Sequence, residues 1–446
     1  TTDGSKPGKR VTIMYGMFYG CANLTAVPDL DTSNAENLSN LFEGCTKLTA
    51  VPTLDTANCM YVSSIFRNCQ ALLKVCDLDL RSAIDSAASL FEGCKSITTA
   101  PSLLNVSDSI TDFNYLFKNC EKLVDIPEIN LANATSIREM FKGCISLIDI
   151  PSFKNGTGKV TIMDGMFDNC ASLSNVPELD TTNVVSATGM FNGCIALTTV
   201  PLFDFSSLKN MSQMFANCTA LASIPLFNTS NVTNMSSAFS GCKKLSTIPL
   251  LDVSKVELMS SMFRDCSALN ELPKLVTSSV IVTNEMFRNC TSLVTIPNTI
   301  DMSKVTNAYA MFYGCSSLRT LPLINLDSIK TGTTNVALFL LDCTSLESCS
   351  FTNNRVSFEA SGLPNLTSIK FYNSYRGITL NVSYNSALTS EALDEMFEAL
   401  SEVEKGNINI SGCLGVYGCD TTIAENKGWT VAIDYSLPHV LKKYTR

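Results

Sequence analysis

Cysteine is the residue whose type and spacing first suggest chemistry in this sequence. The chain of 446 residues holds 19 cysteines, and 14 of them recur at intervals of 24 to 28 residues. These 14 are Cys21, Cys45, Cys69, Cys94, Cys120, Cys144, Cys170, Cys194, Cys218, Cys242, Cys266, Cys290, Cys315 and Cys343. No Cys-x-x-Cys motif occurs, and His439 is the only histidine. The sequence therefore argues against a zinc site and against His-dependent nucleophilic catalysis.

Each of these cysteines belongs to a repeat that reads roughly M-F-x-(G/N)-C-x-x-L-x-x-(I/V)-P-x-L-D-T-S-N-V-T-N-M-S-x. The residue before the cysteine is Gly seven times, Asn five times and Asp twice. These three types tolerate positive φ best, so we expect a left-handed corner that ends a short helix or 3₁₀ turn. Proline follows in 12 of 14 units and is expected to end an extended segment, because it cannot continue a hydrogen-bond ladder.

One such unit cannot bury its apolar side alone, so the units must stack as a solenoid. Stacking aligns the cysteines in a column about 4.8 Å apart and pointing the same way, whereas a disulfide prefers a Cβ separation of about 3.5 to 4.5 Å. We therefore expect reduced, buried thiols that act as small apolar groups and as weak donors to a backbone carbonyl at the corner. A disulfide or metal column is the alternative.

Aspartate or asparagine recurs ten residues after the cysteine, at residues 31, 55, 79, 130, 180, 204, 228, 252 and 325. One oxygen donor per unit is too few for calcium, so we expect these side chains to cap the turn. A second acidic series lies eight residues after the cysteine and comprises Asp29, Asp77, Glu128 and Glu178. Paired carboxylates could hydrolyse a glycoside, but solvated surface charge is the ordinary interpretation.

The period ends after Cys343. Apolar spacing predicts a helix over 391–403 with Ser390 as its N-cap, inside a terminal cap; one face is expected to carry Leu393, Met396, Phe397, Leu400 and Val403. Cys413 and Cys419 could pair in an oxidising compartment, and this question stays open. We expect a flexible segment at 1–10, a repeat solenoid at 11–346 and a repeat-derived cap at 347–446. The first unit carries no visible cap, so its edge could associate with a partner.

Composition restricts the partners. The net charge is −9 and the pI is about 4.9, which argues against nucleic acid and anionic lipid because both recruit Lys/Arg clusters. No apolar run approaches the roughly 18 residues of a membrane span. The N-terminal residues TTDGSKPGKR contain no export leader, so we expect that any such signal has been removed or lies outside this sequence.

The motif M-F-x-x-C-x-x-L-x-x-I-P-x-L-D-T-S-N-V-T-N-M resembles the BspA-like, Treponema-type leucine-rich repeats over about 11–346. The likeness is greatest to the variant found in Bacteroidetes surface proteins and mycoplasma lipoproteins. This resemblance implies an α/β solenoid, a leucine-rich-repeat-like right-handed stack of about 14 coils with a C-terminal capping segment. It also implies an exported or surface-attached protein that functions in adhesion and in host or matrix binding. A lipid-acceptor cysteine is missing, which leaves the mode of attachment open.

We therefore expect a non-enzymatic, extracellular or cell-surface protein that binds a protein or glycan, with no catalytic residue, cofactor or metal. The alternatives are a structural envelope component or spacer and, more remotely, a solenoid glycan-active enzyme. Leu202, Leu226 and Leu250 lie eight residues after the cysteine on three consecutive units. They form a candidate contact surface. The alternative is that the chain turns inward there and these leucines belong to the core.

Overall fold

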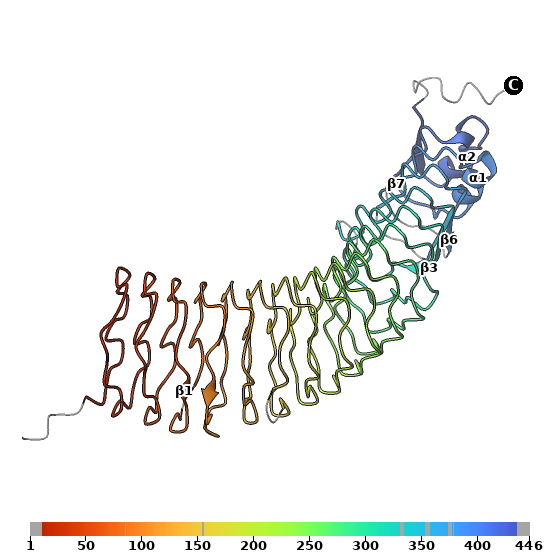
Figure 1. Cartoon of the computed structure of the whole chain (residues 1–446). Helices are drawn as coiled ribbons and strands as arrows, with labels where there is room; N and C mark the ends of the chain where they lie inside the picture. Colours follow the sequence, from red (N-terminus) through yellow and green to blue (C-terminus); the bar gives the residue numbers. More distant parts are fainter. Residues whose placement is uncertain are drawn as a thin grey trace, which may run out of the picture. The chain divides into compact units, whose positions relative to one another are not determined.

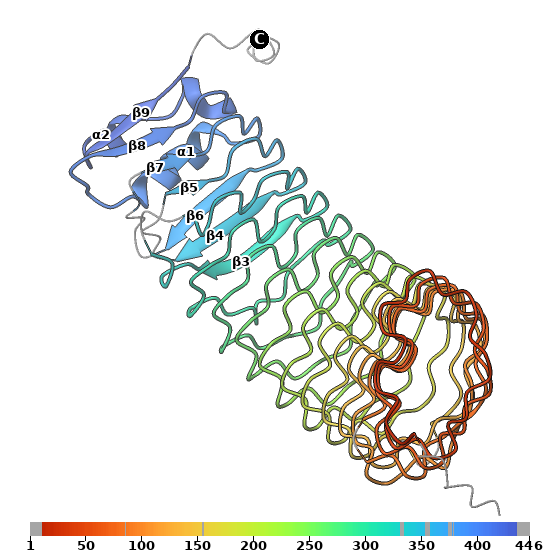
Figure 2. The same cartoon turned by 90° about the vertical axis from the view of Figure 1, so that its left-hand side faces the viewer.

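The computed structural model describes residues 11–84, 86–153, 156–330, 334–352, 357–372, 377 and 379–434. The flexible segment predicted at 1–10 lies outside these residues. The chain divides into two compact units, Thr1–Leu221 and Ala222–Arg446. Both are β-solenoids, with about 15 turns in the chain and few helices (Figure 1). Up to Cys343, each turn corresponds to one sequence repeat and is called a coil below. In the first unit the backbones of the first coils nearly superpose when viewed end-on (Figure 2).

The segment before each cysteine divides its backbone hydrogen bonds between two coils. In the first coil the N–H groups of Gly16, Phe18 and Gly20 donate to carbonyls of the second coil, at 3.0, 2.9 and 2.7 Å. The alternate N–H groups of Tyr19 and Cys21 donate instead to the carbonyl three residues back, at 2.9 and 3.1 Å. The expected short helix or 3₁₀ turn therefore takes the form of consecutive tight turns, because every second donor serves the next coil.

The predicted left-handed corner is confirmed in all 14 repeats, where the residue before the cysteine has a φ between 59° and 78°. A second left-handed residue, which the sequence did not predict, lies five residues before each cysteine, with a φ between 49° and 62°. It includes residues with large side chains such as Tyr115 and Leu338. We attribute this strained backbone to the ladder of bonds to the next coil, since residue type alone does not favour it.

The core of each coil is built on the phenylalanine that precedes the cysteine by three residues. From Phe18 to Phe215 in the first unit, neighbouring rings stack with centroids 5.3 to 5.9 Å apart and planes within 17° of parallel. The same stack runs from Phe239 to Phe312 in the second unit. It ends at Phe339, which meets Phe312 edge-on because it lies four residues, not three, before its cysteine.

Proline affects the pairing between coils but does not always end a strand. Most coils are joined by isolated parallel bridges, such as Ala50 with Lys74. The short strands β1 (Leu78–Asp79) and β2 (Leu103–Leu104) pair in the first unit, where Cys76 replaces the proline. In the second unit β3 (Thr320–Asn325) contains Pro322, and its pairing with β4 (Ser348–Thr352) shifts register at that point. Ser350 replaces proline in β4, which pairs with β6 (Ser368–Tyr372) over five residues in register.

The C-terminal part of the second unit contains a four-stranded parallel sheet in the order β5-β7-β8-β9. Its strands are β5 (Phe358–Glu359), β7 (Thr379–Asn381), β8 (Gly406–Asn409) and β9 (Trp429–Ala432). Three short helices accompany it, namely α1 (Ser390–Glu398), the 3₁₀ helix η1 (Leu414–Tyr417) and α2 (Thr422–Glu425).

Helix α1 lies where the sequence predicted one, but its ends differ. Thr389, and not Ser390, is the N-cap, and its hydroxyl accepts a hydrogen bond from the Ala392 N–H at 3.3 Å. The helix ends at Glu398 rather than at residue 403. Its buried face consists of Leu393, Met396 and Phe397, as the apolar spacing indicated. The predicted face was therefore correct for these three residues, whereas Leu400 and Val403 lie beyond the end of the helix and the cap was placed one residue late.

Candidate functional site

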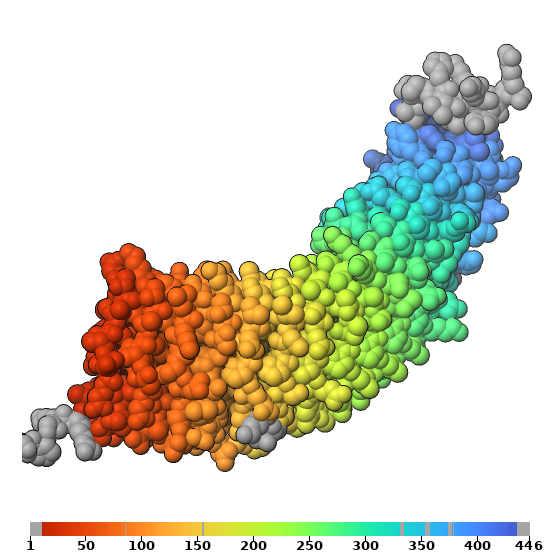
Figure 3. Space-filling model, in the orientation of Figure 1, coloured from red at the N-terminus to blue at the C-terminus, as the bar shows by residue number. Residues whose placement is uncertain are grey.

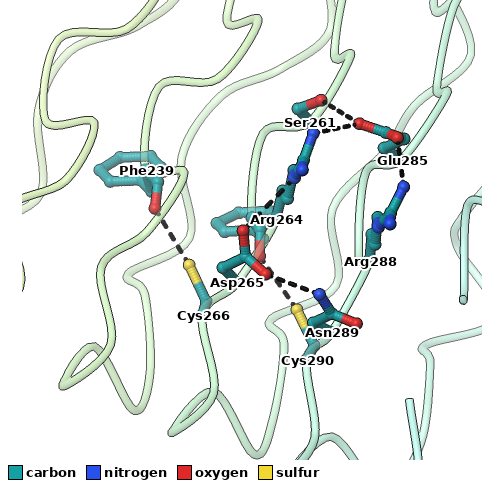
Figure 4. Close-up of polar contacts among 10 residues, drawn as sticks. Phe239, Ser261, Arg264, Asp265, Cys266, Glu285, Arg288, Asn289 and Cys290 are labelled. Atoms are coloured by element: carbon teal, nitrogen blue, oxygen red, sulfur yellow. Dashed lines mark hydrogen bonds and ion pairs between the residues drawn. The ribbon is translucent and has the colours of Figure 1, made fainter. Parts of the chain in front are cut away.

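The repeated cysteines form a ladder of S–H hydrogen bonds between coils. The thiol of Cys45 donates to the carbonyl of Phe18 in the preceding coil, with 3.1 Å between Sγ and oxygen. In the second unit Cys266 donates to the Phe239 carbonyl and Cys290 to the Phe263 carbonyl, both at 3.0 Å (Figure 4). Every cysteine in the structure is a free thiol. The expectation of reduced, buried thiols is confirmed for 13 of the 14 repeated cysteines, whereas Cys21 in the first coil is exposed.

Burial makes these thiols poor nucleophiles. Desolvation raises the pKa of Cys94, Cys144 and Cys218 from 9.0 to about 12. Since the thiolate is the reactive form, the high pKa of the buried thiols favours a structural role for the ladder. Cys413 is buried and donates to the Val382 carbonyl at 3.0 Å, and it is not bonded to Cys419. The sequence left open whether Cys413 and Cys419 pair, and in the structure they are two separate thiols.

The aspartates and asparagines ten residues after the cysteine cap the turn, as predicted. All nine accept a hydrogen bond from the N–H two residues on. The Arg81 side chain also bonds to Asp79, and this bond, with further hydrogen bonds from Asn105 and the Arg81 N–H, lowers the pKa of Asp79 to about 2 against the opposing effect of burial. The residue directly after the turn-capping aspartate or asparagine is often a buried threonine whose hydroxyl bonds to the next coil. The Thr56 hydroxyl, for example, donates to the Asp79 carbonyl at 2.9 Å. Within the described ranges no group of three or more His, Cys, Asp and Glu side chains is placed to hold a metal.

The acidic series does not form pairs. Asp29, Asp77, Glu128 and Glu178 are all exposed and lie on alternate coils of the first unit. At about 4.8 Å per coil, neighbours in this series are roughly 9 to 10 Å apart. Glycosidase carboxylates are separated by about 5 to 9.5 Å, so this spacing lies at or beyond the upper limit. The geometry favours solvated surface charge.

A column of ion pairs joins coils at positions that the sequence did not reveal. In the second unit Glu285 bonds to Arg264 at 2.6 Å and to Arg288 at 2.7 Å, and Arg264 also contacts Asp265 at 3.3 Å (Figure 4). Glu285 and Arg264 are 21 residues apart in sequence, and they meet because they occupy neighbouring coils. Each guanidinium has a carboxylate partner, so this cluster acts as a tie between coils.

The three predicted leucines lie on the surface. The exposed fractions of Leu202, Leu226 and Leu250 are 69%, 60% and 59%. The alternative that they belong to the core is therefore wrong. Leu202 belongs to the first unit, whereas Leu226 and Leu250 occupy the same position on consecutive coils of the second unit. Leu323 occupies that position three coils further on and is 51% exposed, but Lys274 and Asn298 separate it from Leu250.

Coils pack directly against one another within each unit and present a nearly continuous surface in Figure 3. The first unit also contains an open concavity of about 640 Å³ whose lining includes Glu36, Asn58, Met60, Arg81 and Ile84. A smaller one, of about 280 Å³, lies between β6 and α1 in the second unit. Sequence reasoning identified neither, because each is assembled from residues of several coils.

These features define a repeat protein with a fixed inner frame and variable outward side chains. The chain belongs to the family described as "Mycoplasma protein of unknown function, DUF285", whose profile matches residues 7–103, 76–176, 150–247 and 209–323. A comparison with curated proteins finds no significant match. Within the described part of the chain, no helix combines the length and apolarity needed to cross a membrane.

Several solved structures are similar to the chain at low identity. A leucine-rich cell surface protein from Faecalibacterium prausnitzii A2-165 is 20% identical with a TM-score of 0.42, over 66% of this chain and 83% of that one. A leucine-rich repeat protein from Eubacterium ventriosum ATCC 27560 is 16% identical with a TM-score of 0.34, over 70% and 92%. An internalin from Listeria monocytogenes is 13% identical with a TM-score of 0.25, over 75% and 83%.

Proposed function

We propose that this chain is a non-enzymatic, secreted or surface-attached repeat protein that binds a partner protein and functions in adhesion. The observation that carries the proposal is the exposure of Leu226 and Leu250 at one outward position of consecutive coils. The residues that follow them, Phe227 and Leu251, are only 2% exposed. The core of these coils is thus complete without the two leucines, and their side chains are available to a partner.

Burial of these leucines in an interface would supply a useful part of a binding energy. Full burial of a leucine side chain is worth about 1.5 to 3 kcal/mol, so two side chains that are about 60% exposed would contribute roughly 2 to 4 kcal/mol. That corresponds to about 30- to 1000-fold in affinity. Leu202 occupies the equivalent position in the first unit and belongs to the same proposal.

The extracellular or surface location is also part of this proposal. One support is that the repeat resembles the repeat of surface proteins. A second is that the outward side chains vary from coil to coil, whereas the buried residues recur. A pure spacer in the envelope would need no apolar groups on its outward positions. The leucines therefore favour the binding function over the spacer.

The test is an array of purified extracellular-matrix and host-surface proteins probed with the chain and with a Leu202→Ser/Leu226→Ser/Leu250→Ser variant. The matched control is Leu323→Ser, which removes a similarly exposed leucine from the same repeat position. We expect at least one protein to bind the parent and the control, and to bind the triple variant at least about 30-fold more weakly. Equal binding by all three chains would refute the leucine surface. Absence of any ligand would favour the spacer.

A further inference from the structure

We infer that the concavity of the first unit is a binding site for a neutral saccharide. It is formed by successive coils and its volume of about 640 Å³ suits a small ligand. It shares no residue with the leucines at positions 202, 226 and 250. The two proposals can therefore fail separately.

The polar side chains of the concavity have unused hydrogen-bonding capacity. Within the described residues, the Glu36 carboxylate has no hydrogen-bond or ion-pair partner, and the hydroxyls of Thr12 and Ser82 have none. The Asn58 Nδ2 donates to the Ser33 carbonyl at 2.8 Å, which fixes the amide and leaves its oxygen as an acceptor. A carboxylate, an amide oxygen and two hydroxyls complement the hydroxyl groups of a sugar ring.

The lining also contains apolar groups. Met60 and Ile84 come from successive coils, and the Ile84 side chain is 50% exposed. A pyranose ring carries C–H groups on its faces and hydroxyls around its edge. The mixture of aliphatic and hydrogen-bonding side chains therefore matches a saccharide better than a purely polar ion.

An extended peptide fits this concavity less well, because the backbone groups there are already paired. The Glu36 N–H donates to the Thr12 carbonyl at 2.7 Å, the Met60 N–H to the Glu36 carbonyl at 2.8 Å and the Ile84 N–H to the Met60 carbonyl at 3.1 Å. A peptide that binds by adding a strand needs free backbone donors and acceptors. The concavity offers side chains instead.

Charge at the site favours a neutral ligand over an acidic one. Arg81 is the one cationic side chain of the lining, and it already forms an ion pair with Asp79. The Glu36 carboxylate is left uncompensated. A sialylated or sulfated glycan would place like charge beside Glu36 without a free cation to offset it.

The experiment uses the full chain on an array of neutral hexose and N-acetylhexosamine oligosaccharides, with sialylated and sulfated glycans and extended peptides alongside. Isothermal titration with the best neutral oligosaccharide then compares Glu36→Ala and Asn58→Ala with matched controls. Glu257→Ala alters the same repeat position as Glu36 in the second unit. Asn183 occupies the same repeat position as Asn58, and its Nδ2 donates to the Gly158 carbonyl at 2.8 Å. Asn183→Ala therefore removes the equivalent hydrogen bond between coils at a place outside the concavity.

We expect Glu36→Ala and Asn58→Ala each to weaken binding about tenfold or more, while the two controls stay within about twofold of the parent. The triple leucine variant is expected to bind the saccharide normally. The inference is overturned if no neutral saccharide binds, if only acidic glycans or peptides bind, or if the Glu36 and Asn58 variants bind as the controls do.

Discussion

Raising the pH from 8 to 10 is expected to destabilise the first unit through its thiol ladder. Burial raises the pKa of Cys94, Cys144 and Cys218 to about 12, against 9.0 for an ordinary thiol. Below pH 9 each thiol is protonated in both the folded and the unfolded chain. Above pH 9 the unfolded chain ionises while the folded chain does not, so stability is lost as the pH rises from about 9 toward 12.

The magnitude follows from the number of thiols. A thiol whose pKa changes from 9 to 12 on folding costs about 1.4 kcal/mol of stability at pH 10. Eight ladder thiols of the first unit donate to the preceding coil. Cys94, Cys144 and Cys218, whose pKa is about 12, together cost roughly 4 kcal/mol at pH 10, and burial also raises the pKa of the other five, so the loss is a substantial part of the stability of a typical domain.

The assay is urea denaturation in reducing buffer at intervals of half a pH unit from 7.5 to 10.5, followed by circular dichroism. Cys144→Ala is the informative variant, because it removes one titrating group along with its buried volume. It should start less stable but lose about 1.4 kcal/mol less than the parent between pH 8 and 10. A stability that stays constant to pH 10.5, or identical losses in parent and variant, would refute the reasoning.

Three further predictions concern single sites. Gly193→Val is expected to destabilise the fold by about 1 to 3 kcal/mol, since φ is 72° there and a β-branched residue is strained at positive φ, whereas Gly193→Asn is expected to be better tolerated because asparagine adopts this conformation more readily; thermal melting compares them. Thr181→Val removes the hydrogen bond from the buried hydroxyl to the next coil and is expected to cost about 1 to 3 kcal/mol in urea denaturation; an unchanged midpoint would contradict this role. Rapid alkylation of the native chain is expected only at Cys21, Cys76 and Cys419, which are exposed or half-buried, and labelling of ten or more thiols would contradict the ladder.

The sequence predicted those features that restrict residue type. Only Gly, Asn and Asp occur directly before the repeated cysteine, so the left-handed backbone at that position could be predicted from residue type alone. The prediction that proline ends each extended segment was wrong for β3, which continues through Pro322 to Asn325; there the proline only shifts the register of the pairing with β4, as expected for a residue without an N–H. The turn-capping aspartates followed from the same kind of reasoning, because each acts on the backbone two residues away.

Features that depend on contacts between coils could not be predicted in this way. The second left-handed position carries residues as different as Glu139 and Leu338, so its backbone is set by neighbouring coils and not by its own side chain. The ion pair of Glu285 with Arg264 and the lining around Glu36 involve residues more than 20 positions apart. The repeat spacing of 24 to 28 residues varies enough that these partners are identified only once the coils are aligned in space.

Binding and thermal melting, measured on the same preparation of the Leu226→Ser/Leu250→Ser variant, test the central claim most directly. The ligand is the matrix or surface protein that binds the parent chain. Because both leucines are exposed, the account predicts a large loss of affinity, about 30-fold or more, with a melting temperature within about 2 °C of the parent. Unchanged affinity, or a fall of many degrees in melting temperature, would contradict the assignment of these leucines to a contact surface.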